Sequence, residues 1–542
     1  MLDATPLLRL YAAGRLARLA RQDPVRAQRR TLAGLLRRGV RTRFGREHGF
    51  AAIRDVAEYQ ARVPLRRYED FWARYWQAPF PVLRDATWPG TIPYFARSSG
   101  TTSGEAKYIP ISRAMLRSNQ GAALDTMAFH LAARPRSRVF GGRNFLLGGS
   151  TVFERLAPGV FAGDLSGIAA HTMPRWARAR AFPPRDLALI AEWERKIALL
   201  APASLGADVR SISGTPSWLL LFLDRLRDLH PERPARLSAF YPDLELLVHG
   251  GVGFAPYRDR VAVWLEGGHA ETREVYPASE GFIAVQDRGP GEGLRMILDR
   301  GLFYEFVPVD QLDRPRPERR WIGTAEVGVE YALVLTSNAG LWSYVLGDTV
   351  RLVGLDPPRL LVTGRTSFTL SAFGEHLIAE QLDAAVAEAA RTVGSHAVDY
   401  AAGARFAGDG SSRGRHLFVV ELRPPAPCRM GETSFRPTSP PSPRGIAGGD
   451  GRAEEFARVL DAALRRLNAD YADHRTGDYG IMPPEVLLAP PGTFEAWMRA
   501  RGKLGGQNKV PRVIEDPAVL DGLERLAASG QAPDAGPTLS GT

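Results

Sequence analysis

The stretch "LLVTGRTSFTLSAFGEHL", residues 360–377, separates two different patterns of secondary structure along this chain. Before it, from about residue 90, short β-like runs such as "RNFLLGGS" and "LELLVHGG" alternate with helical patterns, which favours an α/β architecture. After it, the pattern restarts as a helix ("HLIAEQLDAAVAEAART"), a strand ("RHLFVVELRPP") and a second helix ("EEFARVLDAALRRLNADY"). We therefore predict an α/β domain followed by a smaller α+β domain.

The predicted domains are a large N-terminal domain of residues 1–365, a small C-terminal domain of residues 366–523 and a disordered tail of residues 524–542. A chain of 542 residues is too long for one ordinary domain. Residues 1–90 read as mostly helical, and "ALIAEWERKIALLA" (residues 188–201) predicts an amphipathic helix on which Lys196 is an ordinary surface residue.

Composition restricts the classes of function. No segment reaches the run of about 18 apolar residues that spans a bilayer, so we expect no stable membrane association. The N-terminal stretch interrupts its apolar run with arginines, unlike a signal peptide, and Cys428 is the only cysteine, so we expect a cytoplasmic protein without disulfides. The net charge is +11, but the arginines are interleaved with acidic residues. This favours a solvated surface that attracts an anionic substrate over a nucleic-acid-binding stripe.

The segment "RSSGTTSGEAKYIPIS", residues 97–112, is a candidate phosphate-binding loop. Its glycines allow a close backbone approach, and its Ser and Thr residues supply hydrogen-bond donors. It differs from a Walker A loop, because Glu105 and Ala106 separate the last glycine from Lys107 and a β-like run follows. The alternative is a flexible polar linker.

Lysine usage favours the phosphate-binding interpretation. Only four of the 70 basic residues are lysines, and three of them lie in two polar, Gly-containing segments, this loop and "RGKLGGQNKVPR" (residues 501–512). Lysine carries a compact point charge, whereas the guanidinium of arginine is planar and bulky. A lysine that this arginine-rich chain retains therefore indicates a position where an arginine side chain could not take over its role.

Three more segments contain candidate site residues. "EVYPASEGFIAV" places Glu280 in a turn, where it could hold a divalent metal or be a solvated turn residue. "GLWSYVLGDTVRLVG" contains Asp348, which could accept the hydroxyl groups of a ribose or belong to a plain hairpin turn. Arg365, at the predicted domain junction, could bind ribose or phosphate or cap the boundary.

The order of these motifs resembles that of the adenylate-forming superfamily, and more closely that of the GH3 acyl-acid amido synthetases. The motifs are, in order, the candidate phosphate-binding loop, "YPASEG", "YVLGD" and the "GR" pair. "RTRFGREHGF" (residues 41–50), "RVPLRRYEDF" (residues 62–71) and "GGQNKVPR" are also similar to that family. The resemblance implies a large adenylate-forming α/β domain and a smaller, mobile α+β C-terminal domain with the active site between them. It further implies a monomeric ligase that uses ATP and Mg²⁺ to adenylate a carboxylic acid and passes the acyl group to an amino acid or another amine.

The resemblance also implies roles for individual residues. Glu280 would hold Mg²⁺, Asp348 would bind the ribose, and "HGGVGF" (residues 249–254) would flank the adenine. The implied catalytic lysines are Lys107, Lys503 and Lys509, with Lys509 preferred over Lys503. The implied nucleotide-binding residues are Ser98, Ser99, Gly100, Thr101, Thr102, Gly250, Gly251, Tyr276, Ser279, Asp348 and Arg365.

Some features depart from the family pattern. Plant members often carry arginines where this chain has Ser343 and Val345, which suggests the bacterial branch and argues against plant-hormone substrates. The acyl pocket is expected within residues 110–280, where "FLLGGSTVFERLAPGVFAGDLSG" (residues 145–167) supplies apolar side chains. Two alternatives are a ligase that forms a thioester with coenzyme A and a non-catalytic protein that binds RNA or acidic membranes.

Overall fold

The computed structural model describes residues 2–98, 107–148, 153–188, 190, 193–251, 254, 257–312, 314–366, 369–370, 372–373, 375, 377–406, 414–423, 449–476, 480–501 and 510–529. The described residues up to Thr366 form one compact unit, and those from Thr369 onward form a second. Both units mix helices with sheets, which confirms the predicted α/β fold class. The domain boundaries inferred from the sequence stay a prediction.

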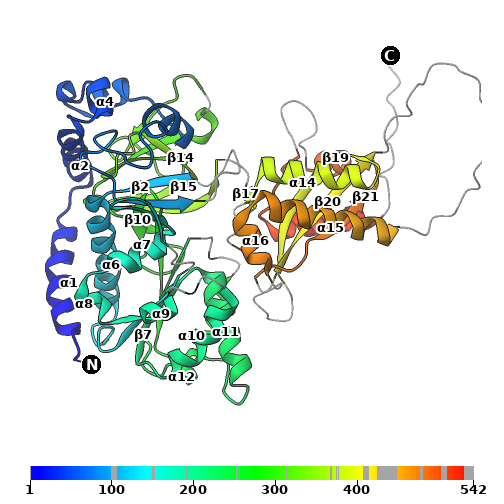
Figure 1. Ribbon diagram of the computed structural model, residues 1–542, viewed down its shortest axis with the longest axis horizontal. Coiled ribbons are helices and arrows are strands. Elements are labelled where there is room, and N and C mark those ends of the chain that lie inside the picture. The colour runs from blue at the N-terminus through cyan, green and yellow to red at the C-terminus, as the bar shows by residue number, and fades with distance from the viewer. Residues whose placement is uncertain are drawn as a thin grey trace, which may run out of the picture. The chain divides into compact units, whose positions relative to one another are not determined.

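The first unit opens with helices, as predicted. They are α1 (Thr5–Ala20), α2 (Pro24–Gly39), α3 (Arg43–Glu47), α4 (Val56–Arg62) and α5 (Tyr68–Phe71), followed by a π-helical turn (Trp72–Trp76). Aromatic side chains of this region, among them Phe44, Phe71 and Trp76, are fully buried against the strands. Helix α1 instead lies along α6 (Arg113–Ala133), as Figure 1 shows.

A sheet of 12 described strands forms the centre of the first unit, in the order β13-β12-β14-β15-β16-β11-β10-β9-β8-β7-β3-β6. The strands β9, β8, β7, β3 and β6 run parallel, and the remaining pairs are antiparallel. In chain order the strands are β3 (Arg143–Leu147), β6 (Ala181–Phe182), β7 (Val209–Gly214), β8 (Leu246–Gly250), β9 (Glu271–Ala278), β10 (Gly281–Val285), β11 (Leu294–Met296), β12 (Leu302–Pro308), β13 (Arg320–Trp321), β14 (Glu330–Ser337), β15 (Tyr344–Leu355) and β16 (Pro358–Arg365).

A second sheet of the same unit carries the start of the candidate phosphate-binding loop. Its order is β2-β1-β5-β4, with β1 (Tyr94–Ser98), β2 (Lys107–Ile111), β4 (Glu154–Ala157) and β5 (Val160–Gly163). Strands β1 and β2 are antiparallel, and Ser98 is the register partner of Lys107. Both ends of the loop are therefore anchored in neighbouring strands, although residues 99–106 themselves lie outside the described part of the chain.

The remaining helices of the first unit are α7 (Leu165–Thr172), α8 (Arg175–Arg178), α9 (Arg185–Ala188), α10 (Trp193–Leu205), α11 (Pro216–Leu229), α12 (Leu237–Phe240) and α13 (Arg258–Leu265). The predicted amphipathic helix at residues 188–201 is found, but it begins later, at Trp193. One prediction for this helix is wrong: Lys196 is buried, with only 2% of the residue exposed. Helical periodicity identifies the faces of a helix, but it does not show what covers each face.

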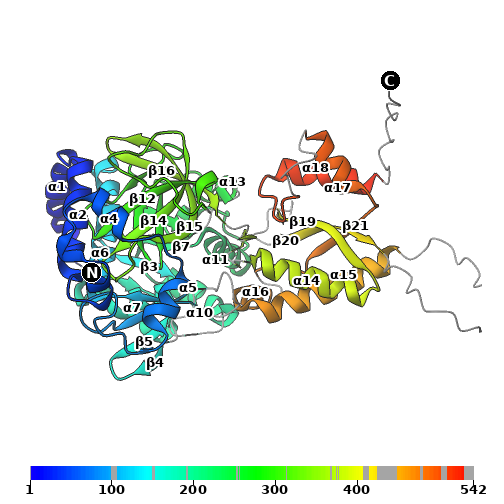
Figure 2. The same ribbon diagram turned by 90° about the horizontal axis from the view of Figure 1, so that it is seen from above.

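The second unit is a three-stranded sheet with helices on both faces, as Figure 2 shows. On one face α14 (Ala379–Thr392) and α15 (Gly449–Leu467) cover Tyr400, Phe418 and Val420, and on the other α18 (Pro517–Ala528) and α17 (Thr493–Ala500) cover Leu417 and Val419. The strands are β19 (His396–Phe406), β20 (Gly414–Arg423) and β21 (Glu485–Ala489), with the short pair β17 (Thr369–Leu370) and β18 (Leu377–Ile378) and helix α16 (Ala469–Arg475). The helix, strand and helix predicted for this part of the chain are α14, β20 and α15.

None of the helices in the described ranges combines the length and the apolar character needed to cross a membrane.

Candidate active site

Two carboxylates that lie far apart in the sequence meet in the first unit. Ser279 and Glu280 form the turn between β9 and β10, where Ala278 and Gly281 are register partners. Asp348 lies within the long strand β15, opposite Arg365 at the end of β16. The interpretation of Gly347-Asp348 as a hairpin turn is therefore wrong, because the strand continues to Leu355.

Side chains from three strands, β9, β15 and β16, surround these carboxylates. The Tyr276 hydroxyl on β9 donates a hydrogen bond to Asp348 Oδ2, and Arg365 Nε lies 3.1 Å from Asp348 Oδ1. Three strands separate β9 from β15 in the order of the sheet, so the sheet curls to bring Tyr276 and Asp348 together. Burial and the charge of Asp348 raise the pKa of Tyr276 well above its usual value, which keeps its proton on the hydroxyl.

Glu280 is buried rather than solvated, with 8% of the residue exposed. Burial, and to a smaller extent the charge of Asp348, raises its pKa from 4.5 to about 7, while a hydrogen bond with Tyr344 acts in the opposite direction. A carboxylate in this position lacks a full counter-charge. A cation bound beside it would favour its ionised form.

Tyr344 connects the carboxylates to the end of the candidate phosphate-binding loop. Its pKa is raised well above the usual value by burial and by Glu280, and the charge of Glu69 adds to the effect. Lys107 Nζ is 3.0 Å from Glu69 Oε1 and 5.1 Å from the centre of the Tyr68 ring. Tyr344 and Glu69 were not predicted as site residues from the sequence. A signal for Tyr344 exists, because it precedes Asp348 by four residues, a spacing that places two side chains on the same face of a strand.

The end of β8 approaches the same region of the sheet. Gly250 is the register partner of Val275, next to Tyr276, and a Cβ at position 250 would lie 2.1 Å from the Val275 carbonyl oxygen, so only glycine fits. Gly251 has a φ of +91°, a conformation that favours glycine. The neighbouring His249 stacks on Phe254 with ring centroids 3.7 Å apart, and burial lowers its pKa to about 3, so the ring is neutral at physiological pH.

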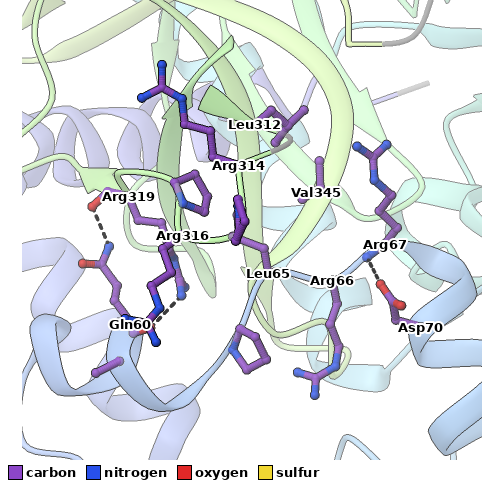
Figure 3. Close-up of a pocket in the computed structure, with 14 residues that line it drawn as sticks. Gln60, Leu65, Arg66, Arg67, Asp70, Leu312, Arg314, Arg316, Arg319 and Val345 are labelled. Carbon is purple, nitrogen blue, oxygen red and sulfur yellow. Dashed lines mark hydrogen bonds between the residues drawn. The ribbon is translucent and has the colours of Figure 1, made fainter. Parts of the chain in front are cut away.

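A hollow of about 840 Å³ lies on the other face of β15. Val345 lines it (Figure 3), and because adjacent residues of a strand point to opposite faces, Val345 faces away from Glu280, to which Tyr344 is hydrogen-bonded. Its lining includes five arginines: Arg66, Arg67, Arg314, Arg316 and Arg319. This hollow is therefore separate from the carboxylate site.

The fold accounts for the serine at position 343. Ser343 is fully buried with a φ of +48°, and its hydroxyl donates to Glu305 Oε2 at 2.9 Å and accepts from Arg319 at 2.7 Å. Arg319 and Glu305 also form an ion pair of 2.7 Å. An arginine at position 343 would bring a second guanidinium to Glu305, whose charge Arg319 already neutralises.

The described donors suit a metal that arrives with phosphate. In the described ranges, no group of three or more carboxylate, imidazole or thiol side chains is arranged to hold a metal alone. Mg²⁺ usually binds through one or two carboxylates together with substrate phosphates and water, a set that Glu280 fits. The side chain of Ser98 and the residues Ser99, Gly100, Thr101, Thr102, Lys503 and Lys509 lie outside the described part of the chain, so their roles stay predictions.

Three sequence profiles of known families match this chain. The profile described as the GH3 family N-terminal domain matches residues 15–147, the GH3 family central domain matches residues 295–365, and the GH3 family C-terminal domain matches residues 380–518.

The curated relatives of this chain include plant enzymes. Indole-3-acetic acid-amido synthetase GH3.3 of Arabidopsis thaliana is 25% identical over 274 residues, which cover 49% of this chain and 43% of the relative's length. The probable indole-3-acetic acid-amido synthetase GH3.2 of Oryza sativa subsp. japonica is 24% identical over 586 residues, which cover 95% of this chain and 92% of the relative.

Two solved structures share the fold across almost the whole chain. The GH3.15 acyl acid amido synthetase has a TM-score of 0.56 at 19% identity and covers 94% of each chain. A 2-hydroxyisobutyryl-CoA ligase, in complex with its acyl-adenylate and CoA, has a TM-score of 0.54 at 17% identity and covers 93% of this chain and 92% of the other.

Proposed function

The chain belongs to the GH3 family, and from this membership we propose that it is an ATP-dependent acyl-acid amido synthetase. It would adenylate a carboxylic acid and transfer the acyl group to an amino acid or another amine. The observation that carries the proposal is the pair of carboxylates, the buried Glu280 and the partly buried Asp348, which Tyr276, Arg365 and Tyr344 hold together. The proposed partners are only these small-molecule substrates, and the protein is proposed to be a monomer.

The residues around this pair match the needs of adenylation. Asp348 would accept the ribose hydroxyl groups, with its carboxylate oriented by Tyr276 and Arg365. Glu280 would hold Mg²⁺, which when bound neutralises part of the triphosphate charge. Lys107, anchored by Glu69, would place a positive charge at the end of the phosphate-binding loop.

The two-step chemistry explains why a nucleotide site is needed. A carboxylate is a poor acyl donor, and attack of its oxygen on the α-phosphate releases pyrophosphate and leaves AMP as a leaving group. The amine then attacks the acyl carbon, the C–O bond to AMP breaks, and the amide and AMP leave. Positive groups around the α-phosphate stabilise the charge that develops in the first step.

The test is acid-dependent exchange of pyrophosphate into ATP across a panel of carboxylic acids, followed by mass analysis of products formed with amino acids or with coenzyme A. Exchange with an acid and an amide product supports the proposal. Exchange with a thioester product supports the second candidate, a coenzyme A ligase, which the fold shared with the 2-hydroxyisobutyryl-CoA ligase favours. Absence of exchange with every acid contradicts both.

We further place the chain in the bacterial branch of the family. The buried network of Ser343, Glu305 and Arg319 supports this placement, because Arg319 already neutralises the carboxylate that an arginine at position 343 would meet. At Val345, an arginine would add a further positive charge to a hollow that five arginines already line. The plant-hormone acids are therefore not proposed as substrates.

Lys107→Arg is expected to lower acid-dependent pyrophosphate exchange by about tenfold, the effect of one weakened charge-assisted contact. The ammonium fits between Glu69 and the ring of Tyr68, and its side chain is only 12% exposed. The larger, planar guanidinium would have to move out of this position although the charge is kept. Arg113→Lys, an exposed exchange at the start of α6, is the control and should keep full activity. Full activity of Lys107→Arg would return the loop to the linker interpretation.

Lys509→Ala is expected to reduce pyrophosphate exchange by about 10- to 100-fold, because it removes a charge from the α-phosphate. The same variant should still convert a synthetic acyl-adenylate and the amine into the amide, since that step needs no new charge at the phosphate. Equal loss of both half-reactions would indicate a general defect. A loss confined to Lys503→Ala would show that Lys503 is the acting lysine.

A further inference from the structure

The positive charge of this chain is concentrated in one short segment. Residues 1–46 contain 12 arginines and only two acidic residues, Asp3 and Asp23, which gives them a net charge of +10. The other 496 residues contain 58 basic and 57 acidic side chains, so together they are almost neutral. The interleaving of arginines with acidic residues therefore holds only beyond residue 46, and the first helices form an electrostatic region of their own.

The arginines of α2 lie on the outer side of the first unit. In two perpendicular views, α1 and α2 line the same edge of this unit (Figures 1 and 2). Helix α2 buries Leu32 and Leu35 in the core that it shares with the central sheet. At about 3.6 residues per turn, Arg26, Arg30 and Arg37 lie on the opposite side of the helix, and all three are exposed.

Helix α1 is apolar on two faces. One face carries Leu8 and packs along α6, but on the other face Leu7 and Leu10 are 71% and 74% exposed. Arg9 and Arg18, both exposed, lie at the two borders between these faces. A helix that only covers a protein core carries polar residues on its outer face, so this exposed stripe indicates a further partner. The stripe consists of Leu7, Leu10, Ala13, Gly14 and Ala17.

The charge of this surface is not neutralised by the protein itself. Within the described ranges, none of the three outward arginines of α2 forms an ion pair. The two acidic residues of the segment are engaged elsewhere: Asp23 caps α2 by accepting from the Arg26 backbone N–H, and Asp3 pairs with Arg138. The positive charge is therefore available to an external anion.

We propose that the outer face of α1 and α2 binds the surface of a membrane that contains anionic lipids. Leu7 and Leu10 enter the boundary between head groups and acyl chains, and the arginines of α2 attract the lipid phosphates. The association is peripheral and reversible, because so few exposed leucines transfer little apolar area out of water. This inference does not depend on the proposed function.

The exposed leucines favour a membrane over a nucleic acid as the partner. Both offer phosphate groups to arginines, but a lipid surface also offers an apolar layer that takes Leu7 and Leu10 out of water. The leucine, alanine and glycine side chains of the stripe give no hydrogen-bond donor to a base or a phosphate. Arg9 and Arg18, at the borders of the stripe, are long enough to keep their charges at the level of the head groups while their stems lie along apolar surface.

The experiment is co-sedimentation of the full chain with vesicles of phosphatidylcholine alone or with about 30% phosphatidylglycerol, at low salt and at about 0.5 M NaCl. The wild type should bind the anionic vesicles at least about tenfold more tightly than the neutral ones at low salt. High salt should remove most of this difference, because it screens the arginines from the lipid charge.

The arginines are tested by the triple exchange Arg26→Gln, Arg30→Gln and Arg37→Gln. This variant should bind anionic vesicles about 100-fold more weakly at low salt, since each arginine near such a surface contributes about fivefold. The matched control removes the same total charge from exposed positions of the second unit and should bind as the wild type does. Its exchanges are Arg458→Gln, Arg465→Gln and Arg499→Gln.

The leucines are tested by Leu7→Ser combined with Leu10→Ser. This variant should bind anionic vesicles about tenfold more weakly or less, while its salt dependence stays that of the wild type, because it loses apolar area but no charge. The variants of α1 and α2 change only exposed side chains, so their melting temperatures should equal that of the wild type. Pyrophosphate exchange without vesicles should also be unchanged, which separates this inference from the proposed function.

The inference is overturned if the wild type does not bind anionic vesicles at low salt, or if it binds neutral vesicles equally well. It is also overturned if the control variant loses as much affinity as the α2 variant, or if the leucine variant binds as the wild type does. Binding of duplex DNA without binding of vesicles, lost in the α2 variant and kept in the leucine variant, would identify a nucleic acid as the partner instead.

Discussion

Glu280→Gln is expected to reduce acid-dependent pyrophosphate release by about 100- to 1000-fold, the cost of removing one group that stabilises developing phosphate charge. Glutamine keeps the shape of the side chain, and it can keep a hydrogen bond with Tyr344. It removes the negative charge that a divalent metal requires. The measurement is exchange of labelled pyrophosphate into ATP at saturating acid and Mg²⁺. Activity within about threefold of wild type would reject the role, because such a loss corresponds to less than about 1.4 kcal/mol, the free energy of a tenfold change.

The fold of this variant can be checked through the pH dependence of its stability. The pKa of Glu280 rises from 4.5 to about 7 on folding, so between these values the folded chain holds more protons on this group than the unfolded chain. Its contribution to wild-type stability is therefore present below pH 4.5 and is lost as the pH rises to about 7. Glu280→Gln lacks this slope, and at pH 8 it should unfold no earlier than the wild type. The exposed Glu292→Gln, in the next turn, is the matched control and should change neither activity nor the slope.

Asp348→Ala is expected to weaken ATP binding by about 100-fold or more, as two charge-assisted hydrogen bonds of about 1.5–3 kcal/mol each are lost. The carboxylate already accepts from Tyr276 and Arg365, but its two oxygens offer about four acceptor positions, which leaves room for both ribose hydroxyl groups. Calorimetric titration with ATP and Mg²⁺ gives the affinity directly.

Two companion variants make the Asp348 result specific. Tyr276→Phe removes one neighbour of the carboxylate and keeps its charge, so its loss of affinity should stay below about tenfold, the effect of a single bond. Asp348→Asn keeps the shape of the side chain and tests folding. Normal ATP affinity in Asp348→Ala would exclude the ribose role, and failure of both Asp348 variants to fold would identify this residue as a structural part of β15.

The fold was largely predictable, because it depends on patterns that are local in sequence. Alternating apolar runs identified the strands of the central sheet, and α14, β20 and α15 lie where their periodicities placed them. The Gly347-Asp348 pair was harder to place, because a glycine with a φ of +95° inside a strand has the same sequence signal as a turn. Pairing of β15 with β14 on both sides of Gly347-Asp348, and with β16 from Asp348 onward, decided between the two, and such pairing joins distant residues.

Motifs identified the residues of the candidate site, whereas only the fold gives their environment. Glu280 was expected in a turn and lies in one, but its burial depends on residues near position 344 that pack against it. For the same reason Lys196 was misplaced, since the segments that cover it lie about 30 and 50 residues earlier in the chain. Tyr344 could have been found from its four-residue spacing to Asp348 along a strand.

The two halves of the central sheet have a consequence for the engineering of this protein. Glu280 lies in the turn between β9 and β10 and Asp348 lies on β15, both in the antiparallel part of the sheet, whereas Lys196 reaches the end of the parallel strand β3. Since β10 and β15 contribute nothing to the end of β3, diversity introduced around Gly148 and Lys196 leaves both carboxylates in place. A combinatorial library confined to that end of the sheet would therefore vary the surface beside the parallel strands while the proposed nucleotide site stays constant, and the same separation lets natural selection change one of the two regions without the other.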